Sequence, residues 1–166
     1  METPKVLKKF DLFIDGRGHA AVMEEVTLPT ITEKTEDWQG GGMDGEIDIG
    51  MGLEKLELEY SVGEYNKEIL KAFSGRNAIG FTARGALENE EGTVEAVIVE
   101  MRGKHRQFDP GNWKAGDHVK PKMKATLTYY KLSIGGEVIY EIDVINSIRI
   151  VGGVDQMQEI RQALGQ

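Results

Sequence analysis

The sequence predicts a mainly β fold, an antiparallel β-sandwich or barrel with one or two short flanking α-helices. Three observations lead to this prediction. Apolar and polar residues alternate with a period of two in many segments, a Gly-Gly pair separates the two strongest of them, and only two short segments have a helical pattern. The length of 166 residues suits a single domain spanning residues 1–166.

The clearest alternation lies in the segment LEKLELEYSV. One side of this expected strand carries Leu56, Leu58, Tyr60 and Val62, and the other carries Lys55, Glu57, Glu59 and Ser61. Further strands are expected at residues 11–14, 20–28, 31–38, 79–87 and 93–101. Residues 120–151 predict two strands joined across Gly135 and Gly136, because a Gly-Gly pair supplies the positive φ values of a tight hairpin turn.

Two segments predict short amphipathic helices that each cover an apolar face of the sheet. In NKEILKAFSG, Asn66 is the expected N-cap and Gly75 follows the helix end. Its apolar stripe comprises Ile69, Leu70 and Phe73. In GGVDQMQEIRQALG, Asp155 and Gln158 are spaced as a capping box. The apolar positions of this second helix are Met157, Ile160 and Leu164.

Composition excludes several classes of function. The chain contains no cysteine, so it has no disulfide and no thiolate chemistry. Its formal charge of −8 argues against a tight grip on nucleic acid, although nucleic acid could still move through a passage lined by such a protein. The N-terminus lacks the pattern of a secretory leader, and no apolar run is long enough to span a membrane. We therefore expect synthesis in the cytoplasm and no stable membrane binding.

No catalytic, cofactor or metal site is predicted. Gly40, Gly42 and Gly45 fit the pattern G-x-G-x-x-G, but the strand-like EIDIG follows where a phosphate site needs a helix. The histidines lack metal-ligand spacing and are expected at the surface or at interfaces. They are His19, His105 and His118. No G-x-S-x-G motif places a nucleophilic serine.

A glycine-rich segment near residues 36–52 is expected to be a long loop with a function in assembly. Six glycines lie between Gly40 and Gly52, and Trp38 at the base is a residue type favoured in interfaces. Exposed sheet edges would be useful if neighbouring copies pair across them. A different class of function, a monomeric module that binds a carbohydrate or small ligand, stays open. Its contact residues would be Trp38, Trp113, Tyr129 and Tyr130.

Five segments together resemble the major tail tube protein of contractile-tailed phages and of R-type pyocins. They are LFIDGRGHA, EEVTLPTITEKTEDWQGGGMDGEIDIGMGLEKLE, FDPGNWKAGD, TYYKLSIGGEVIYEID and GGVDQMQEIRQALG. The resemblance runs in order from about Leu12 to the C-terminus, and the motifs are long and specific. The tube subunit of a contractile secretion machine, which shares the architecture, is the alternative within assembly proteins.

The resemblance implies a structural subunit without catalysis. Its copies would form hexameric rings that stack into a hollow tube, with a continuous inner β-barrel of about four strands per subunit and about 24 per ring. The tube would be driven through the bacterial envelope by a contractile sheath and would conduct DNA in a phage or ions in a pyocin. Implied partners are further copies of the chain, the tail sheath protein, the baseplate or tube initiator and the tail terminator, with DNA as transient lumenal cargo. Assembly in the host cytoplasm and a final location in the tail of the released particle follow.

The resemblance also assigns roles to residues of the glycine-rich segment. It implies that the long loop near residues 36–52 helps to stack one ring on the next. The residues that match the stacking motif are Trp38, Gly40, Gly41, Gly42, Met43 and Asp44.

Lumen-lining residues are expected where strand alternation directs a carboxylate away from the core. Glu57 and Glu59 fit this rule best, and the further candidates are Glu46, Asp48 and Glu95. Six copies at −8 give a ring of about −48, and a like-charged wall would repel DNA phosphates.

Overall fold

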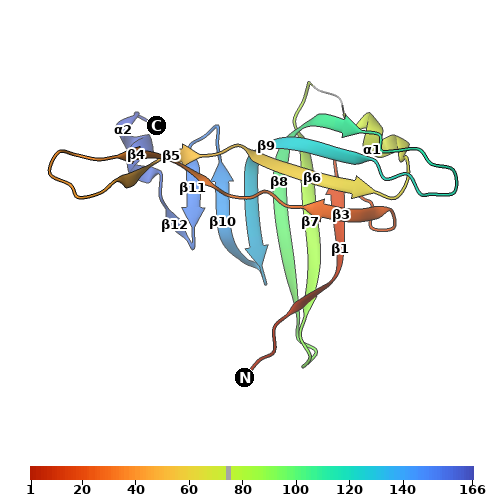
Figure 1. The fold of residues 1–166 in the computed structure, drawn as a ribbon. Coiled ribbons are helices and arrows are strands. Elements are labelled where there is room, and N and C mark those ends of the chain that lie inside the picture. Colours follow the sequence, from red (N-terminus) through yellow and green to blue (C-terminus); the bar gives the residue numbers. More distant parts are fainter. Residues whose placement is uncertain (74–75) are drawn as a thin grey trace.

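The computed structural model describes residues 1–73 and 76–166 and is mainly antiparallel β with two short helices (Figure 1). This confirms the predicted fold class. The first half contains β1 (Val6–Ile14), β2 (Arg17–Gly18), β3 (Met23–Thr27), β4 (Glu33–Trp38), β5 (Ile47–Leu53), β6 (Leu56–Val62) and α1 (Lys67–Lys71). The second half contains β7 (Ile79–Glu88), β8 (Val94–Asp109), β9 (Lys122–Ile134), β10 (Glu137–Asp143), β11 (Ile148–Val151), β12 (Val154–Asp155) and α2 (Gln158–Ala163).

Two layers arise because β8 and β9 are long and take part in both. Residues 94–103 of β8 and 129–134 of β9 belong to a main sheet ordered β12-β11-β10-β9-β8-β7-β1-β2. Residues 103–109 of β8 and 122–127 of β9 join β6 and β3 in a second layer ordered β3-β6-β9-β8. We call this layer the crossing sheet. Figure 1 shows β6 and β3 running across the strands of the main sheet.

The bend between the layers lies at Gly103. Arg102 pairs with Tyr129 and Gly103 pairs with Leu127, so Thr128 is an extra residue that breaks the register. The pairing of β8 with β7 ends at Gly103, which lies opposite Ile79, the first residue of β7. Beyond this point β8 leaves the main sheet and continues in the crossing sheet.

The core fills the space between the two layers. The crossing sheet contributes the predicted apolar side of β6, namely Leu56, Leu58, Tyr60 and Val62, all buried. The main sheet contributes buried side chains that include Leu12, Phe81, Val99, Met101 and Ile142. Because the alternation in β6 survives intact, Glu57 and Glu59 point away from the core.

The hairpin at Gly135 and Gly136 is confirmed. β9 ends at Ile134 and β10 begins at Glu137, and the two glycines have φ values of 58° and 85°. The strand expected at 93–101 is much longer than predicted, since β8 continues to Asp109. After the bend, only His105 is buried in the stretch Lys104–Asp109, so the alternation no longer marks a strand.

Helix α1 forms as predicted. The Asn66 side chain accepts hydrogen bonds from the backbone N–H groups of Glu68 (3.0 Å) and Ile69 (3.3 Å), as an N-cap should. Ile69 is buried against the core. The helix ends at Lys71 with Ala72 as its C-cap, which is earlier than predicted, and Phe73 of the predicted stripe is exposed. Gly75 itself lies outside the described residues.

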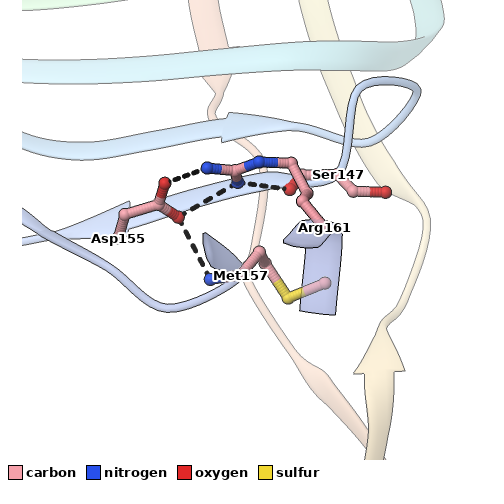
Figure 2. A network of polar contacts seen from close by, with 4 residues as sticks. All are labelled: Ser147, Asp155, Met157 and Arg161. Carbon is pink, nitrogen blue, oxygen red and sulfur yellow. Dashed lines mark hydrogen bonds and ion pairs between the residues drawn. The ribbon is translucent and has the colours of Figure 1, made fainter. Parts of the chain in front are cut away.

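Two predictions about α2 are wrong: Asp155 does not cap the helix, and the apolar side chains of the helix are not buried. The helix begins after Met157 without a side-chain cap, because the Asp155 carboxylate instead accepts from the Met157 N–H (3.1 Å) and pairs with Arg161. Figure 2 shows Arg161 folded back onto Asp155 and donating to the Ser147 carbonyl oxygen at 2.8 Å. No residue of α2 is buried, and Ile160 and Leu164 are 51% and 65% exposed. The helix follows β12, the strand at the end of the main sheet.

None of the helices in the described ranges is long and apolar enough to cross a membrane.

Candidate functional site

The outer face of the crossing sheet, turned away from the core, is polar. Cross-strand pairing places Glu59 opposite both Thr27 of β3 and Lys124 of β9. Two shallow depressions on this face are lined largely by its side chains. The residues that the register places on this face are Glu25, Thr27, Glu57, Glu59, Ser61, Lys104, Gln107, Asp109, Lys122, Lys124 and Thr126.

This face is nearly balanced in charge. Among the paired strand residues, four carboxylates are offset by three lysines, a formal charge of −1 per subunit, and Lys55 just before β6 adds a further positive charge beside Glu57. The expectation of a strongly acidic wall assumed that the whole-chain charge of −8 would be spread over it. Sequence alternation shows the acidic residues of β6, but it does not show that lysines of β9 lie beside them.

Glu57 is held between two lysines. Its carboxylate oxygens lie 3.1 Å from Lys124 Nζ and 3.3 Å from Lys55 Nζ. The hydrogen bond to Lys124, followed by the one to Lys55, keeps the pKa of Glu57 below its ordinary value. Both lysines are exposed enough for solvent to screen these pairs. Glu59 is more exposed than Glu57 and makes no ion pair within the part of the chain that the structure describes.

The structure does not bring the other lumen candidates to this face. Asp48 lies on β5, opposite Asp37 of β4, in a separate two-stranded sheet, and Glu46 precedes β5. Glu95 lies at the start of β8 in the main sheet, opposite Leu87, and pairs with Lys5. Only Glu57 and Glu59 of the five candidates share one surface.

Two edges of the crossing sheet are open in the single chain. β3 pairs only with β6, and residues 104–109 of β8 pair only with β9 among the described strands. The β3 edge carries Glu24 and Glu25, whereas the β8 edge carries Lys104 and Arg106. Beside β3 lies an apolar groove of about 380 Å³, lined by residues that include Leu7, Phe10, Val26 and Leu28. Open strand edges of opposite charge, one of them next to an apolar groove, can pair with each other between copies.

The segment expected to be a long loop is mostly a β-hairpin. β4 ends at Trp38 and β5 begins at Ile47, so only residues 39–46 form the connection. β4 confirms the strand expected at 31–38, whereas β5 lies where the loop was expected. Every residue of β4 and all but the last residue of β5 are exposed. Figure 1 shows this hairpin extending from one end of the molecule.

The tip of the hairpin has a defined turn. The Met43 N–H donates to the Gly40 carbonyl oxygen at 3.1 Å, and the Gln39 side chain donates to the Met43 carbonyl oxygen at 3.1 Å. A Cβ atom on Gly40 would lie 2.8 Å from the Trp38 ring, so a larger residue here would displace that exposed side chain. Gly41 and Gly42 have open space around them and no positive φ. The fold of one subunit therefore gives no reason for glycine at 41 and 42.

One side of the hairpin is apolar and unusually exposed. Ile47, Ile49 and Met51 alternate along β5 on the same face, and Trp38 lies opposite Ile47. Their exposed fractions are 50%, 43%, 55% and 53%. Exposed apolar side chains grouped along a strand in this way are typical of a contact surface.

The predicted location of two histidines is wrong. His19 and His105 are buried, and the His105 ring packs among core aromatic rings, while His118 is exposed. The described residues contain no group of three or more His, Cys, Asp or Glu side chains placed to hold a metal ion.

His105 is a neutral hydrogen-bonding member of the core. Its Nδ1 lies 3.3 Å from the Ala72 carbonyl oxygen, which can only accept, so Nδ1 carries the proton. Its Nε2 then accepts from the Tyr60 hydroxyl at 2.6 Å. The rings of Tyr60, Phe73 and Phe81 surround the imidazole. Burial among them lowers the pKa of His105.

Stability should therefore fall in mild acid. Because the pKa of His105 is lower in the folded chain than in the unfolded chain, its contribution is complete above about pH 6.5 and is lost as the pH falls toward the folded value. The loss is limited to about 1.4 kcal/mol per pH unit for one proton. Urea unfolding between pH 7.5 and 5.5 measures it. His105→Phe should flatten the profile and His118→Gln should not; equal slopes in the wild type and His105→Phe would contradict this account.

The aromatic residues proposed for a ligand-binding module do not converge. Trp38 lies on the hairpin and Trp113 in the loop 110–121, at opposite ends of the molecule (Figure 1). Tyr130 is buried in the core, and the Tyr129 hydroxyl donates to Glu141 at 3.2 Å. The apolar groove beside β3 contains none of the four.

Open strand edges, an exposed hairpin and exposed loops are features typical of structural proteins that assemble. The chain belongs to the phage tail tube protein FII family, whose model matches residues 4–165. It is 33% identical, over 99% of both chains, to the tail tube protein of Escherichia phage P2. It is 38% identical to the major tail tube protein of Serratia phage KSP20, over 89% of this chain and 88% of the relative.

Solved structures confirm the fold. The chain is similar to one from the PVC sheath-tube complex of an extracellular contractile injection system, with a TM-score of 0.63 and 12% identity. The match covers 80% of this chain and 93% of the other. A chain of the anti-feeding prophage cap matches with a TM-score of 0.62, 11% identity and the same coverage.

Proposed function

We propose that this tail tube subunit forms hexameric rings whose crossing sheets join into one continuous inner β-barrel. The observation that supports the ring most directly is the pair of open edges with opposite charge at β3 and at residues 104–109 of β8. Each subunit contributes four strands to the crossing sheet, in two connected pairs, β3 with β6 and β8 with β9. Pairing of β3 with β8 of the next copy would repeat around the ring and leave no open edge.

In this arrangement the polar outer face of the crossing sheet lines the lumen. The opposite face is occupied by the core, so only the outer face is free to meet water in a channel. The wall would carry neighbouring carboxylates and lysines rather than a single sign of charge. Such a surface stays hydrated and gives DNA phosphates no continuous basic track to bind. Low friction for passing cargo follows from this balance.

Replacing Glu59 by lysine tests the lumen directly. The change makes the outer face more positive by two charges per subunit and touches no ion pair of the described residues. Tubes should still assemble, but DNA release from particles carrying Glu59→Lys should be slower and should recover as salt is raised.

Glu90→Lys at the turn between β7 and β8 serves as the matched control, because it makes the same charge change far from the crossing sheet. Unchanged release by Glu59→Lys would count against lumenal placement of this face. Slower release by both variants would point to net charge rather than to position.

The hairpin of β4 and β5 is proposed to stack one ring on the next. Its apolar strip is exposed in the single subunit, and its tip residues Gly41 and Gly42 have no role in the subunit fold. Glycine permits close backbone approach, which suits a contact with another copy. In the tube, Trp38, Gly40 and Met43 would shape the tip, and Asp44 would lie beside it.

The tube would sit inside a contractile sheath and connect a baseplate initiator to a terminator. Family membership and the relatives from phages P2 and KSP20 support assembly in the cytoplasm of a bacterial host and a place in the tail of the released particle. DNA would be transient cargo in a phage, and ions in a headless particle. The subunit of a contractile secretion machine is the second candidate, supported by the shared fold with injection-system chains.

A further inference from the structure

The two ends of the crossing sheet carry different exposed segments. At one end, β6 follows the β4–β5 hairpin after Glu54 and Lys55. At the other end, Ser61 pairs with Lys122 and Lys122 with Asp109, so the loop 110–121 between β8 and β9 extends beyond the sheet there. Figure 1 shows the hairpin and this loop reaching opposite extremes of the molecule.

The hairpin end is acidic. Between Glu33 and Leu53 it contains six carboxylates and one lysine, a formal charge of −5 out of the −8 of the whole chain. Asp37 lies directly opposite Asp48, a like-charge pair that costs stability in the isolated hairpin. The exposed strip of Trp38, Ile47, Ile49 and Met51 lies on the other face of the hairpin, where Glu36 is opposite Ile49, so the hairpin as a whole is suited to a partner that is basic and partly aromatic.

The loop end has the complementary properties. Residues 106–122 contain four basic and two acidic side chains, a formal charge of +2 in an otherwise acidic protein. Trp113 is 81% exposed. Its indole Nε1 donates to the Tyr65 hydroxyl at 2.9 Å, and Tyr65 donates to the Pro110 carbonyl oxygen at 2.6 Å.

The backbone of this loop is held in a defined conformation by hydrogen bonds and tight turns. The Gly111 N–H donates to Asp109 at 3.0 Å, the Asp117 N–H donates to the Lys114 carbonyl oxygen at 3.1 Å, and Gly111 and Gly116 have positive φ. An aromatic ring that is anchored by its N–H but exposed over most of its surface loses little conformational entropy when a partner covers it. These are the features of an anchor residue in an interface.

We infer that the loop 110–121 of one subunit receives the β4–β5 hairpin of a subunit in the adjacent ring. This inference rests on the proposed tube and names the surface that its stacking hairpin contacts. Trp113 packs on the apolar strip of the hairpin, and Lys114 and Lys120 face its carboxylates. Because the two surfaces differ and lie at opposite ends, a stack keeps free hairpins at one end and free loops at the other, so growth continues rather than closing.

Charge reversal with rescue tests the contact. The hairpin variant is Glu46→Lys with Asp48→Lys, and the loop variant is Lys114→Glu with Lys120→Glu; all four side chains are exposed. The control, Glu90→Lys with Glu137→Lys, reverses two exposed carboxylates at turns of the main sheet. The critical concentration for tube formation is measured by sedimentation, with tail initiator proteins present and with electron microscopy of the pellets.

Each reversal alone should raise the critical concentration about tenfold or more, and the chain carrying all four changes should return to within about threefold of the wild type. The control should match the wild type. If the wild type forms tubes but the loop variant behaves like the control, the inferred contact is wrong. It is also wrong if the chain carrying all four changes shows no rescue. Neither result contradicts the proposed tube. If the wild type forms neither rings nor tubes, the proposed function itself fails.

Discussion

Replacing Gly103 by alanine is expected to prevent stable folding of the subunit. Gly103 lies at the bend where β8 leaves the main sheet, and the backbone of β9 passes directly against it. An added Cβ would overlap the Thr126 carbonyl oxygen and lie 2.8 Å from Leu127 Cα. All these atoms belong to the backbone, so no side chain can turn aside to make room. We expect a loss of about 3 kcal/mol or more.

Urea or thermal unfolding of Gly103→Ala measures this effect, with Gly80→Ala as the matched control. Gly80 lies on the neighbouring strand β7, has no positive φ, and has open space where its Cβ would be. Gly80→Ala should be neutral or stabilise by up to about 1 kcal/mol. Equal stability of the two variants would mean that the two layers are not joined through a tight bend at residue 103.

Deleting Gly40 to Gly42 is expected to abolish long tubes while leaving the subunit folded. No residue of the hairpin between Glu33 and Gly52 is buried, so its tip contributes little to the core. The deletion removes the turn closed by Met43 N–H and Gly40 and takes away the tip that is proposed to reach the next ring. The free energy of unfolding should change by less than about 1 kcal/mol.

Electron microscopy and sedimentation measure the outcome, and rings without long tubes are expected. A second variant, Gly41→Val with Gly42→Val, keeps the length of the hairpin but adds side chains where the subunit has open space. It should fold normally and stack poorly, because the added groups would prevent close approach of another copy. Long tubes from both variants would contradict a stacking role for this hairpin.

The parts of the fold that the sequence predicts well are those in which local chemistry and packing agree. β6 alternates cleanly because one side meets the core and the other meets water. Asn66 caps α1, and Gly135 and Gly136 turn the chain between β9 and β10. In each case the residues that decide the structure lie within one short segment.

Long-range neighbours explain what the sequence could not predict. The nearly balanced outer face depends on Lys124 lying beside Glu57, and these residues belong to strands far apart in the chain. The buried place of His105 depends on a bend that no local pattern marks. The apolar positions of α2, such as Ile160, suggest burial, yet they are exposed in the single subunit.

Surfaces that we propose to contact another copy are hard to predict from a sequence treated as one isolated domain. β4 matches the strand expected at 31–38, but β5 lies where a long loop was expected, because the segment is rich in glycine and both faces of the strand are exposed. Its exposed strip and the exposed Trp113 make physical sense once further copies are considered. The stacking role assigned to Trp38, Gly40, Gly41, Gly42, Met43 and Asp44 stays a prediction.

A cryo-electron microscopy reconstruction of tubes assembled from the purified protein tests the central proposal most directly. We expect stacked six-fold rings in which β3 of each subunit pairs with residues 104–109 of β8 in the next, and in which Glu59 faces the lumen. Monomers alone at every concentration, even with tail initiator proteins present, would contradict the account. Rings in which these two strand edges stay unpaired would contradict it equally.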